Sequence, residues 1–472
     1  MKTYIGKSIL ASVAFAAVLL TAASCTDFLN ILPKGQKIPA TLVDYESFLR
    51  NEYSVMRTDV TEAIVLDNDR YVTPSYLNYY PLYAANYFWD QTADRVALNK
   101  SDESTYYVAY SAISYCNLIV ENAPEATEAT DAEKNVVIAY AKVVRAMNYF
   151  MLANFYADTY DKTTASTKLS VPIIESADIN APSTQVTIQK IYEYIIGNVT
   201  EALDYLPDMG VTMLHPGKGA AYAFLARVYL QMSDFTNALK YADMALEING
   251  NLYDWTAYYA KYQTQIEKTA SYTRTPSPMS YDYVENYNYR HGSTYYASSE
   301  NGINEWRAGQ FEDGDAKFLA RWKVRTVGTE TYHYSTLTGL FNYGGMTTVE
   351  VYLIKAECLA RSGDVPGAMA IVNKIRKTRI LAAKYVDQSA SNLADAMDKI
   401  MTLKRNELIL TLTPFADMRR LNDEGTYKRT LTKTVGTNTY TLAPDSYMWT
   451  MPFPQGATDN PGNGTLTQNV SK

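Results

Sequence analysis

Apolar residues recur at helical spacing through residues 349–379 and predict a pair of helices. In the first half they fall three or four positions apart, on one helix face: Val349, Leu353, Ala356 and Ala360. The polar residues expected outside that face are Lys355, Glu357 and Arg361. Gly363 can end the first helix and Asp364 can cap the second one. The segment therefore predicts an antiparallel helical hairpin with a short connection.

A similar pattern lies upstream, in residues 220–248. A shift that superposes Tyr222 on Tyr352 also superposes Asp234 on Asp364, and small residues then match along the helices. The pattern fits the helix–turn–helix unit of a tetratricopeptide repeat, whose apolar face is buried only by stacking on its neighbours. Generic helical scaffolding explains such hairpins equally well, so they indicate a fold and no particular function.

Other segments either carry the helical period or lack any regular period. Further helices are expected over residues 41–56, 102–122, 131–156, 187–206 and 392–410. Residues 67–100 and 251–345 lack a clear period and are rich in Tyr and Trp. Long irregular segments between helices are usually functional or disordered, and the aromatic content argues against disorder. We therefore expect two ordered surface loops that carry aromatic rings.

Tyrosine is unusually frequent in this chain. There are 42 Tyr, 13 Phe and 5 Trp residues, more than a core usually requires. Many rings are therefore expected to meet solvent or a ligand, with a Tyr-rich helical core as the alternative. The C–H-rich face of a sugar can lie on Trp or Tyr, while its hydroxyls bond to polar side chains around the ring.

The N-terminus resembles a lipoprotein export signal. Lys2 and Lys7 precede an apolar run over residues 9–20, and small residues then lead to Cys25. Such a run is too short to cross a membrane and stop, which favours a signal peptide over residues 1–24. Cys25 resembles the acylated cysteine of a bacterial lipobox, and acylation there would anchor a soluble domain to a membrane.

The net charge and the other two cysteines narrow the classes of protein to which this chain can belong. Removal of residues 1–24 takes away two lysines and no acid, so the formal net charge falls from −7 to −9. That balance disfavours binding to a phosphate backbone, and we expect no nucleic-acid partner. Cys116 and Cys358 lie on helical patterns beside apolar residues, so we expect small core residues and no disulfide between them.

No catalytic constellation stands out. The three histidines, His215, His291 and His333, show no H-E-x-x-H spacing, and the chain has no G-x-S-x-G motif. The 50 acidic residues offer no means of selecting a glycosidase pair, so the residues alone leave an enzyme open. Asp313 and Asp315 could hold calcium, but a solvated acidic turn is favoured and no cofactor is expected.

Several motifs resemble the SusD/RagB family, surface lipoproteins that capture nutrients for outer-membrane importers in Bacteroidetes. The run Y-L-I-K-A-E-C-L-A-R-S-G-D at residues 352–364 resembles the signature helix of the family. Residues 143–158 resemble its R-A-x-x-Y-F helix, and residues 405–420 resemble its E-L…R-W-x-D-L-x-R block. The closing P-F-P, N-P and Q-N motifs lie within residues 452–469, so the resemblance spans nearly all of the mature chain.

The resemblance implies an all-α-rich fold in a single SusD-like domain over residues 25–472. Tetratricopeptide-like hairpins would form a right-handed superhelical scaffold, with long irregular loops and a few short strands. The helical pairs are expected at about residues 102–160, 187–249 and 347–379. The loops of the ligand face are expected at about residues 67–100 and 251–345.

The resemblance also implies a function. Family members capture oligosaccharides or polysaccharides and deliver them to a SusC-like TonB-dependent transporter, so we expect a lipid-anchored, surface-exposed outer-membrane protein that is not an enzyme. The candidates for stacking on a glycan are Trp89, Trp306, Trp255, Tyr80, Tyr83 and Tyr283. The alternatives are the same fold with a peptide or another nutrient as cargo, and a surface hydrolase.

Overall fold

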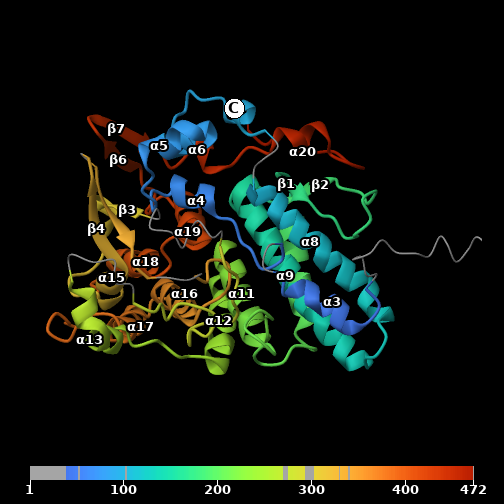
Figure 1. Cartoon of the computed structure of the whole chain (residues 1–472), viewed down its shortest axis with the longest axis horizontal. Coiled ribbons are helices and arrows are strands. Elements are labelled where there is room, and N and C mark those ends of the chain that lie inside the picture. Colours follow the sequence, from blue (N-terminus) through green and yellow to red (C-terminus); the bar gives the residue numbers. More distant parts are fainter. Residues whose placement is uncertain are drawn as a thin grey trace, which may run out of the picture. The chain divides into compact units, whose positions relative to one another are not determined.

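The computed structural model describes residues 39–51, 54–100, 104–268, 275–292, 302–328, 330–337 and 341–470. The described residues from Thr41 onward form one compact unit. The predicted signal peptide and Cys25 lie outside the described residues. Helices dominate the described part of the chain, as the sequence predicts (Figure 1).

Long helices arranged in neighbouring pairs form the scaffold. They are α8 (Ser104–Asn122), α9 (Asp131–Tyr156), α10 (Ile188–Ala202), α11 (Lys218–Gln231), α12 (Phe235–Ile248), α16 (Thr348–Arg361), α17 (Val365–Lys377), α18 (Leu393–Glu407) and α19 (Leu412–Asn422). α9 packs against α8 and α10, α11 packs against α12, and α16 packs against α12, α17 and α18. The predicted helical pairs are therefore present.

The hairpin of α16 and α17 turns where the sequence predicts. Gly363 has a φ of 95°, a left-handed conformation that glycine adopts without strain. Asp364 then caps α17 by accepting a hydrogen bond from the backbone N–H of Gly367 at 2.9 Å. The upstream pair repeats the arrangement, because Asp234 caps α12 through the N–H of Asn237 at 3.1 Å.

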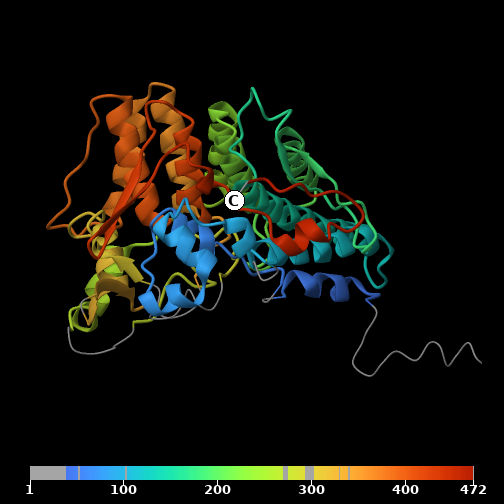
Figure 2. The ribbon, with the colours of Figure 1, turned by 90° about the horizontal axis from the view of Figure 1, so that it is seen from above.

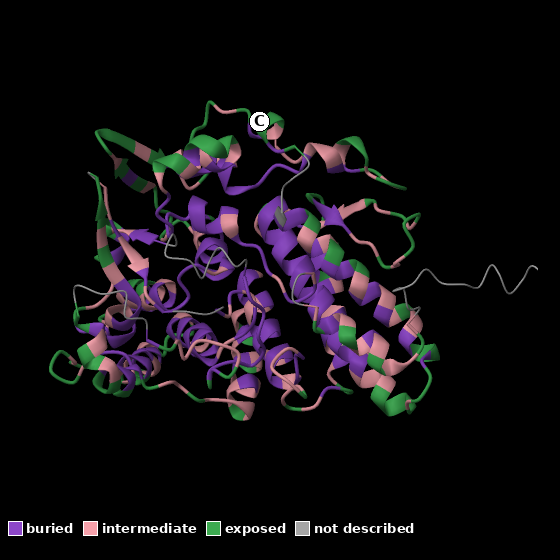
Figure 3. Cartoon of the chain, in the orientation of Figure 1, coloured by how far each residue is buried: buried purple, intermediate pink, exposed green. Residues whose placement is uncertain are grey.

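The longest helix lies in the core. Among the described residues α9 is the one helix long and apolar enough to cross a membrane, and 83% of that apolar window is buried inside the fold. Thr130 opens it with a capping box that involves Glu133. Figure 3 shows buried residues along α9 and the neighbouring helices, whereas α5 and the hairpin of β6 and β7 are largely exposed. α9 is thus a core helix of this unit.

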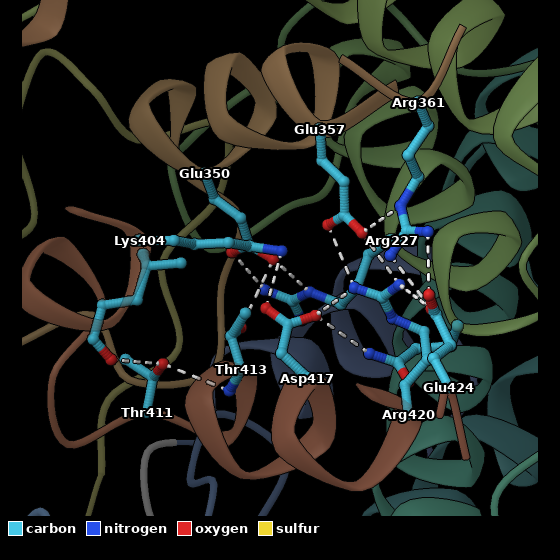
Figure 4. Close-up of polar contacts among 12 residues, drawn as sticks. Arg227, Glu350, Glu357, Arg361, Lys404, Thr411, Thr413, Asp417, Arg420 and Glu424 are labelled. Atoms are coloured by element: carbon cyan, nitrogen blue, oxygen red, sulfur yellow. Dashed lines mark hydrogen bonds and ion pairs between the residues drawn. The ribbon is translucent and has the colours of Figure 1, made fainter. Parts of the chain in front are cut away.

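A buried group of charges joins α16 to α11 and α19 (Figure 4). Glu350 accepts two hydrogen bonds from Arg227, both at 2.7 Å, and Glu357 accepts two from Arg420 at 2.9 and 3.0 Å. The expectation that Glu357 lies on an outer helix face was therefore wrong, because its side chain is fully buried. α18 packs against α16, and Arg420 of α19 neutralises Glu357.

Short helices and small sheets replace much of the two predicted irregular loops. Residues 67–100 contain α5 (Pro74–Tyr79), α6 (Pro81–Phe88) and α7 (Arg95–Leu98), which follow α4 (Thr61–Leu66). Residues 251–345 contain α13 (Trp255–Ile266), α14 (Glu305–Ala308), α15 (Ala316–Arg321), β3 (Gly302–Asn304), β4 (Trp322–Val327) and β5 (Glu330–Ser335). Most of these elements are too short to show a period, which is why the sequence pattern concealed them.

The remaining elements connect and close the unit. They are α3 (Leu42–Leu49), the 3-10 helices η1 (Ala123–Glu125) and η3 (Tyr447–Trp449), β1 (Leu169–Pro172), β2 (Gln185–Thr187), β6 (Leu431–Val435), β7 (Asn438–Leu442) and α20 (Gln455–Asp459). The strands form two antiparallel pairs, β1–β2 and β6–β7, and one sheet in the order β3-β5-β4. Figure 2 shows the short blue helices after residue 60 on one side and the long orange helices α16–α18 on the other.

Candidate functional site

Two of the six predicted stacking residues are substantially exposed. Tyr80 and Trp306 each keep 47% of their surface accessible. Residues 67–71, which follow α4, reach both rings through one intermediate side chain each. Asp69 binds Arg405, which lies over Trp306, and Arg70 lies over Tyr76, which contacts Tyr80. This short segment is therefore the structural centre of the candidate site.

Trp306 lies on α14, beside a buried group of charges. Arg307 Nε donates to Asp69 Oδ1 at 2.6 Å, and Arg405 Nε donates to the same oxygen at 2.9 Å. The Arg405 guanidinium lies 5.5 Å from the centre of the Trp306 ring. Asn304 caps α14 by accepting from the backbone N–H of Arg307 at 2.8 Å. These contacts hold the indole in place, so its side chain loses little conformational entropy when a ligand binds.

Burial and charge determine the protonation of this polar group. Burial lowers the pKa of Arg307, and the Asp69 carboxylate opposes that shift. Burial raises the pKa of Asp67 well above its ordinary value, and the neighbouring charge of Asp69 adds to the shift. Asp67 therefore keeps its proton to a higher pH than an ordinary aspartate, while Asp69 faces the two guanidinium groups.

A group of tyrosines lies on the other side of the same segment. The Arg70 guanidinium lies 5.9 Å from the centre of the Tyr76 ring and 5.7 Å from that of the Tyr83 ring. Tyr76 contacts Tyr80 with ring centres 4.6 Å apart, and Tyr79 contacts Tyr80 at 6.0 Å. Tyr79 is 82% exposed. α5 and α6 thus present a layer of rings with one face towards solvent.

Tyr71 connects the tyrosines to the strand before Trp306. Its backbone N–H donates to the carbonyl of Gly302 at 2.8 Å, and its ring stacks on Tyr332 with centres 4.4 Å apart. A Cβ on Gly302 would lie 2.7 Å from the Tyr332 ring, so this close approach requires glycine. We define the aromatic face as Trp306 together with Tyr76, Tyr79 and Tyr80.

The other four predicted stacking residues are buried in the core. Trp255 is fully buried and donates from Nε1 to the hydroxyl of Tyr283 at 3.1 Å. Trp89 donates from Nε1 to the carbonyl of Leu66 at 2.9 Å. Tyr83 is 4% exposed, and burial raises its pKa. The structure assigns Trp89, Trp255, Tyr83 and Tyr283 to packing, because a ligand has no access to their faces.

The acids considered for calcium have partners within the protein. Asp313 pairs with the exposed Lys384 at 2.8 Å, and the neighbouring acid Glu312 pairs with Arg376 at 2.5 Å. Asp315 is buried and caps α15 by accepting from the backbone N–H of Phe318 at 2.9 Å. Within the described ranges no group of three or more His, Cys, Asp or Glu residues could hold a metal ion.

Sequence reasoning missed the groups that support the exposed rings. Asp69 and Arg405 are separated by more than three hundred residues in the sequence, and no local pattern relates them. Arg405 belongs to a recognisable motif, but only the fold directs its guanidinium towards Trp306. Tyr79 and Tyr80 stand together before Pro81, and that pair was the local signal for an exposed aromatic turn.

Two family models match this chain. A model described as "Starch-binding associating with outer membrane" matches residues 27–230, and the model of the SusD family matches residues 252–471. A curated relative, SusD-like protein P2 of Formosa agariphila, is 28% identical over 138 residues, 29% of this chain. That match covers 26% of the length of the relative, about a quarter.

Solved structures share the fold across nearly the whole chain. A SusD-like carbohydrate binding protein from Bacteroides vulgatus has a TM-score of 0.65 at 18% identity, and the match covers 92% of this chain and all of that one. Surface glycan-binding protein A from Bacteroides uniformis has a TM-score of 0.65 at 16% identity, with the same coverage. The helical pairs, the matched models and these structures agree, and the chain is a member of the SusD/RagB family.

Proposed function

We propose that this protein binds glycans at the cell surface, and that the aromatic face is where a sugar ring stacks. Membership of the SusD family and the resemblance to structures named as carbohydrate-binding or glycan-binding support the ligand class. The main observation in favour of this site is the pair of half-exposed rings: Trp306 lies under Arg405, and Tyr80 contacts Tyr76.

The chemistry of the aromatic face suits a neutral sugar. An indole or phenol face accepts the C–H groups of a pyranose, and the tyrosine hydroxyls can bond to sugar hydroxyls at the rim. Trp306 and Tyr80 are held by their neighbours before a ligand arrives, which keeps the entropic cost of binding low. A shallow, exposed face also releases its ligand readily, as a protein that passes its cargo onward requires.

The cellular role follows from the family. The protein is anchored to the outer membrane through acylated Cys25, faces the exterior and delivers bound oligosaccharide to a SusC-like TonB-dependent transporter. Capture requires no bond-making step, and on this proposal the chain is a binding protein and not an enzyme. Near Trp306 the buried Asp69 pairs with both Arg307 and Arg405, a role in holding the arginines.

The first test is native affinity electrophoresis of a soluble chain that starts after Cys25. Gels would contain soluble starch, xylan, galactomannan, laminarin or mucin. We expect one polymer to retard the wild-type chain, with no reducing sugar released during incubation. Release of reducing sugar would contradict the assignment as a binding protein, and a bound peptide identified by mass spectrometry would contradict the glycan cargo.

Substitution of Trp306 tests the site itself. Trp306→Ala removes one stacked ring, worth about 1.4 kcal/mol, and should weaken the affinity about tenfold. Trp306→Phe keeps an aromatic face and should retain most of the affinity. Tyr205→Ala is a matched control, because Tyr205 is 50% exposed and has no place in the aromatic face. Unchanged affinity in Trp306→Ala would remove this residue from the site.

A further inference from the structure

A second aromatic groove lies away from the aromatic face, along α8. It has a cavity volume of about 550 Å³ and lies between α8, the loop after β1 and the segment that contains α20. Figures 1 and 2 show these elements apart from α5, β3 and β4. We define the α8 groove by six of its lining residues: Tyr106, Tyr107, Tyr110, Ser114, Asp178 and Asn460.

The walls of the α8 groove are joined before any ligand binds. Ser183 donates from its backbone N–H to the carbonyl of Asn463 at 3.1 Å, and Asn463 Nδ2 donates to the carbonyl of Asn180 at 2.9 Å. On the other side Asn117 Nδ2 donates to the carbonyl of Ile174 at 2.7 Å. Three segments far apart in the sequence therefore form one rigid groove, as ligand pockets usually are.

Tyrosine rings form one side of the groove. Tyr106 and Tyr110, one helical turn apart on α8, have ring centres 4.7 Å apart, and Tyr107 lies 5.5 Å from Tyr106. The Tyr110 hydroxyl donates to the carbonyl of Pro172 at 2.8 Å, which fixes its ring. Tyr107 is 38% exposed, so a ligand in the groove can reach its ring.

The polar groups of the groove are mostly uncharged. Ser114 of α8 is exposed, and Asn460 faces the groove from the C-terminal segment. Among the described lining residues Asp178 carries the one charge. Such a lining disfavours a phosphate or another anion, and its hydroxyl and amide groups suit a ligand rich in neutral hydroxyls.

From this geometry we propose that the α8 groove is a second glycan site that takes a neutral oligosaccharide. The inference rests on the proposed function for the ligand class but uses a separate set of residues. A volume of about 550 Å³ lies within the range of small-ligand sites and admits a short stretch of sugar. A long polymer held at both sites would gain avidity beyond either site alone.

Titration calorimetry with hexasaccharides of the polymer that retards the wild-type chain tests the number of sites. We expect two sites in the wild type and one in Tyr107→Ala, while the site that includes Trp306 keeps its affinity. Trp306→Ala should weaken its own site about tenfold and keep the site that Tyr107→Ala removes, and the double variant should show only the weakened site. Tyr107→Phe keeps the ring and should retain both sites, and Tyr205→Ala should also retain both.

The possible failures separate the two proposals. A single site that weakens in Trp306→Ala and is unaffected by Tyr107→Ala would overturn the α8 groove and leave the proposed function standing. A site lost only in Tyr107→Ala would overturn the assignment of the aromatic face and support the groove. Binding that neither substitution changes, or no binding to any of the five polymers, would overturn both.

Footprinting of the unsubstituted chain tests the α8 groove without relying on the folding of any variant. Hydroxyl radicals oxidise exposed tyrosines, and bound oligosaccharide should protect Tyr107 at least threefold while leaving Tyr205 unchanged. Equal oxidation of Tyr107 with and without the oligosaccharide would contradict the α8 groove, whatever the variants show.

Discussion

At the scale of residues, tyrosine serves mainly as a core side chain with a polar tip. Tyr149, Tyr258 and Tyr287 are buried, yet each hydroxyl donates to a backbone carbonyl, at 3.0, 2.8 and 2.6 Å. Rings that end in a satisfied hydroxyl can fill a helical core at little cost. The Tyr-rich composition therefore reflects packing first, and exposed rings such as Tyr79 and Tyr107 are the minority that can serve a ligand.

Lys433 is a buried cation between two rings. It is 7% exposed, and its Nζ lies 4.1 Å from the centre of the Tyr87 ring and 4.1 Å from that of the Trp89 ring. Burial lowers the pKa of Lys433 to about 7, against the opposing charge of Asp67. An exposed lysine in the unfolded chain keeps a pKa of about 10.4. The two states therefore bind different numbers of protons between these values.

The pH dependence of Lys433→Met tests that shift. Between about pH 7 and pH 10 the unfolded wild type binds more protons than the folded one, so its free energy of unfolding should rise with pH. Lys433→Met lacks this titration, so the stability of the wild type relative to the variant should increase over that window. Urea unfolding at several pH values measures it, and parallel curves would show that the rings keep the lysine at its ordinary pKa.

At the scale of elements, α16 is the helix around which its neighbours are arranged. It packs against α11, α12, α17 and α18, and it carries two buried glutamates, Glu350 and Glu357. Burial raises the pKa of Glu357, but Arg420 and the other nearby cations outweigh burial and lower it to about 2. An ion pair in this position connects α16 to α19 and sets how the two helices meet.

Glu357→Gln should be strongly destabilising. The substitution removes the carboxylate that makes the two shortest contacts with buried Arg420 and leaves Asp417 and Glu424 as its acidic partners, so it should cost about 3 kcal/mol of unfolding free energy. The contribution of Glu357 is present above about pH 4.3 and should be lost as the pH falls to about 2. Urea unfolding measures both effects.

An exposed ion pair supplies the control. Asp398 and Arg429 are 59% and 65% exposed, so Asp398→Asn should cost less than about 1 kcal/mol. Equal losses in Glu357→Gln and Asp398→Asn would show that the buried network contributes no more than a surface pair.

At the scale of the whole molecule, one hydrophobic core extends through most of the unit that begins at Thr41. It includes residues of α3, α8, α9, α11 and α19, with a smaller cluster around α16, α17 and α18. Cys116 of α8 and Cys358 of α16 both belong to the large core. Both are free and buried, which confirms the prediction that they do not pair.

These two thiols report whether the unit unfolds as a whole. Burial raises the pKa of each to about 12, so neither should react with a thiol reagent while its helix is packed. We expect both to be alkylated with the same urea midpoint, because they share one core. Differential alkylation followed by peptide mapping measures each thiol in the unsubstituted chain. Distinct midpoints would show that α8 and α16 belong to separately unfolding parts.

The sequence by itself determined the helical scaffold and the family. Caps such as Asp234 and Asp364 and the apolar period act over a few residues, so their consequences can be read locally. The motif of residues 352–364 indicated the family for the same reason, because it is also a local pattern. The sequence pattern did not predict short helices such as α5 and α6, because they contain too few residues to repeat a period.

Only the tertiary structure decided which aromatic rings face solvent. Trp89 and Trp306 look alike in the sequence, but Trp89 bonds to the carbonyl of Leu66 in the core whereas Trp306 rests on Arg405 at the surface. Glu357 is buried because α19 brings Arg420 to it. Exposure and charge pairing depend on segments distant in the chain, and no local pattern contains them.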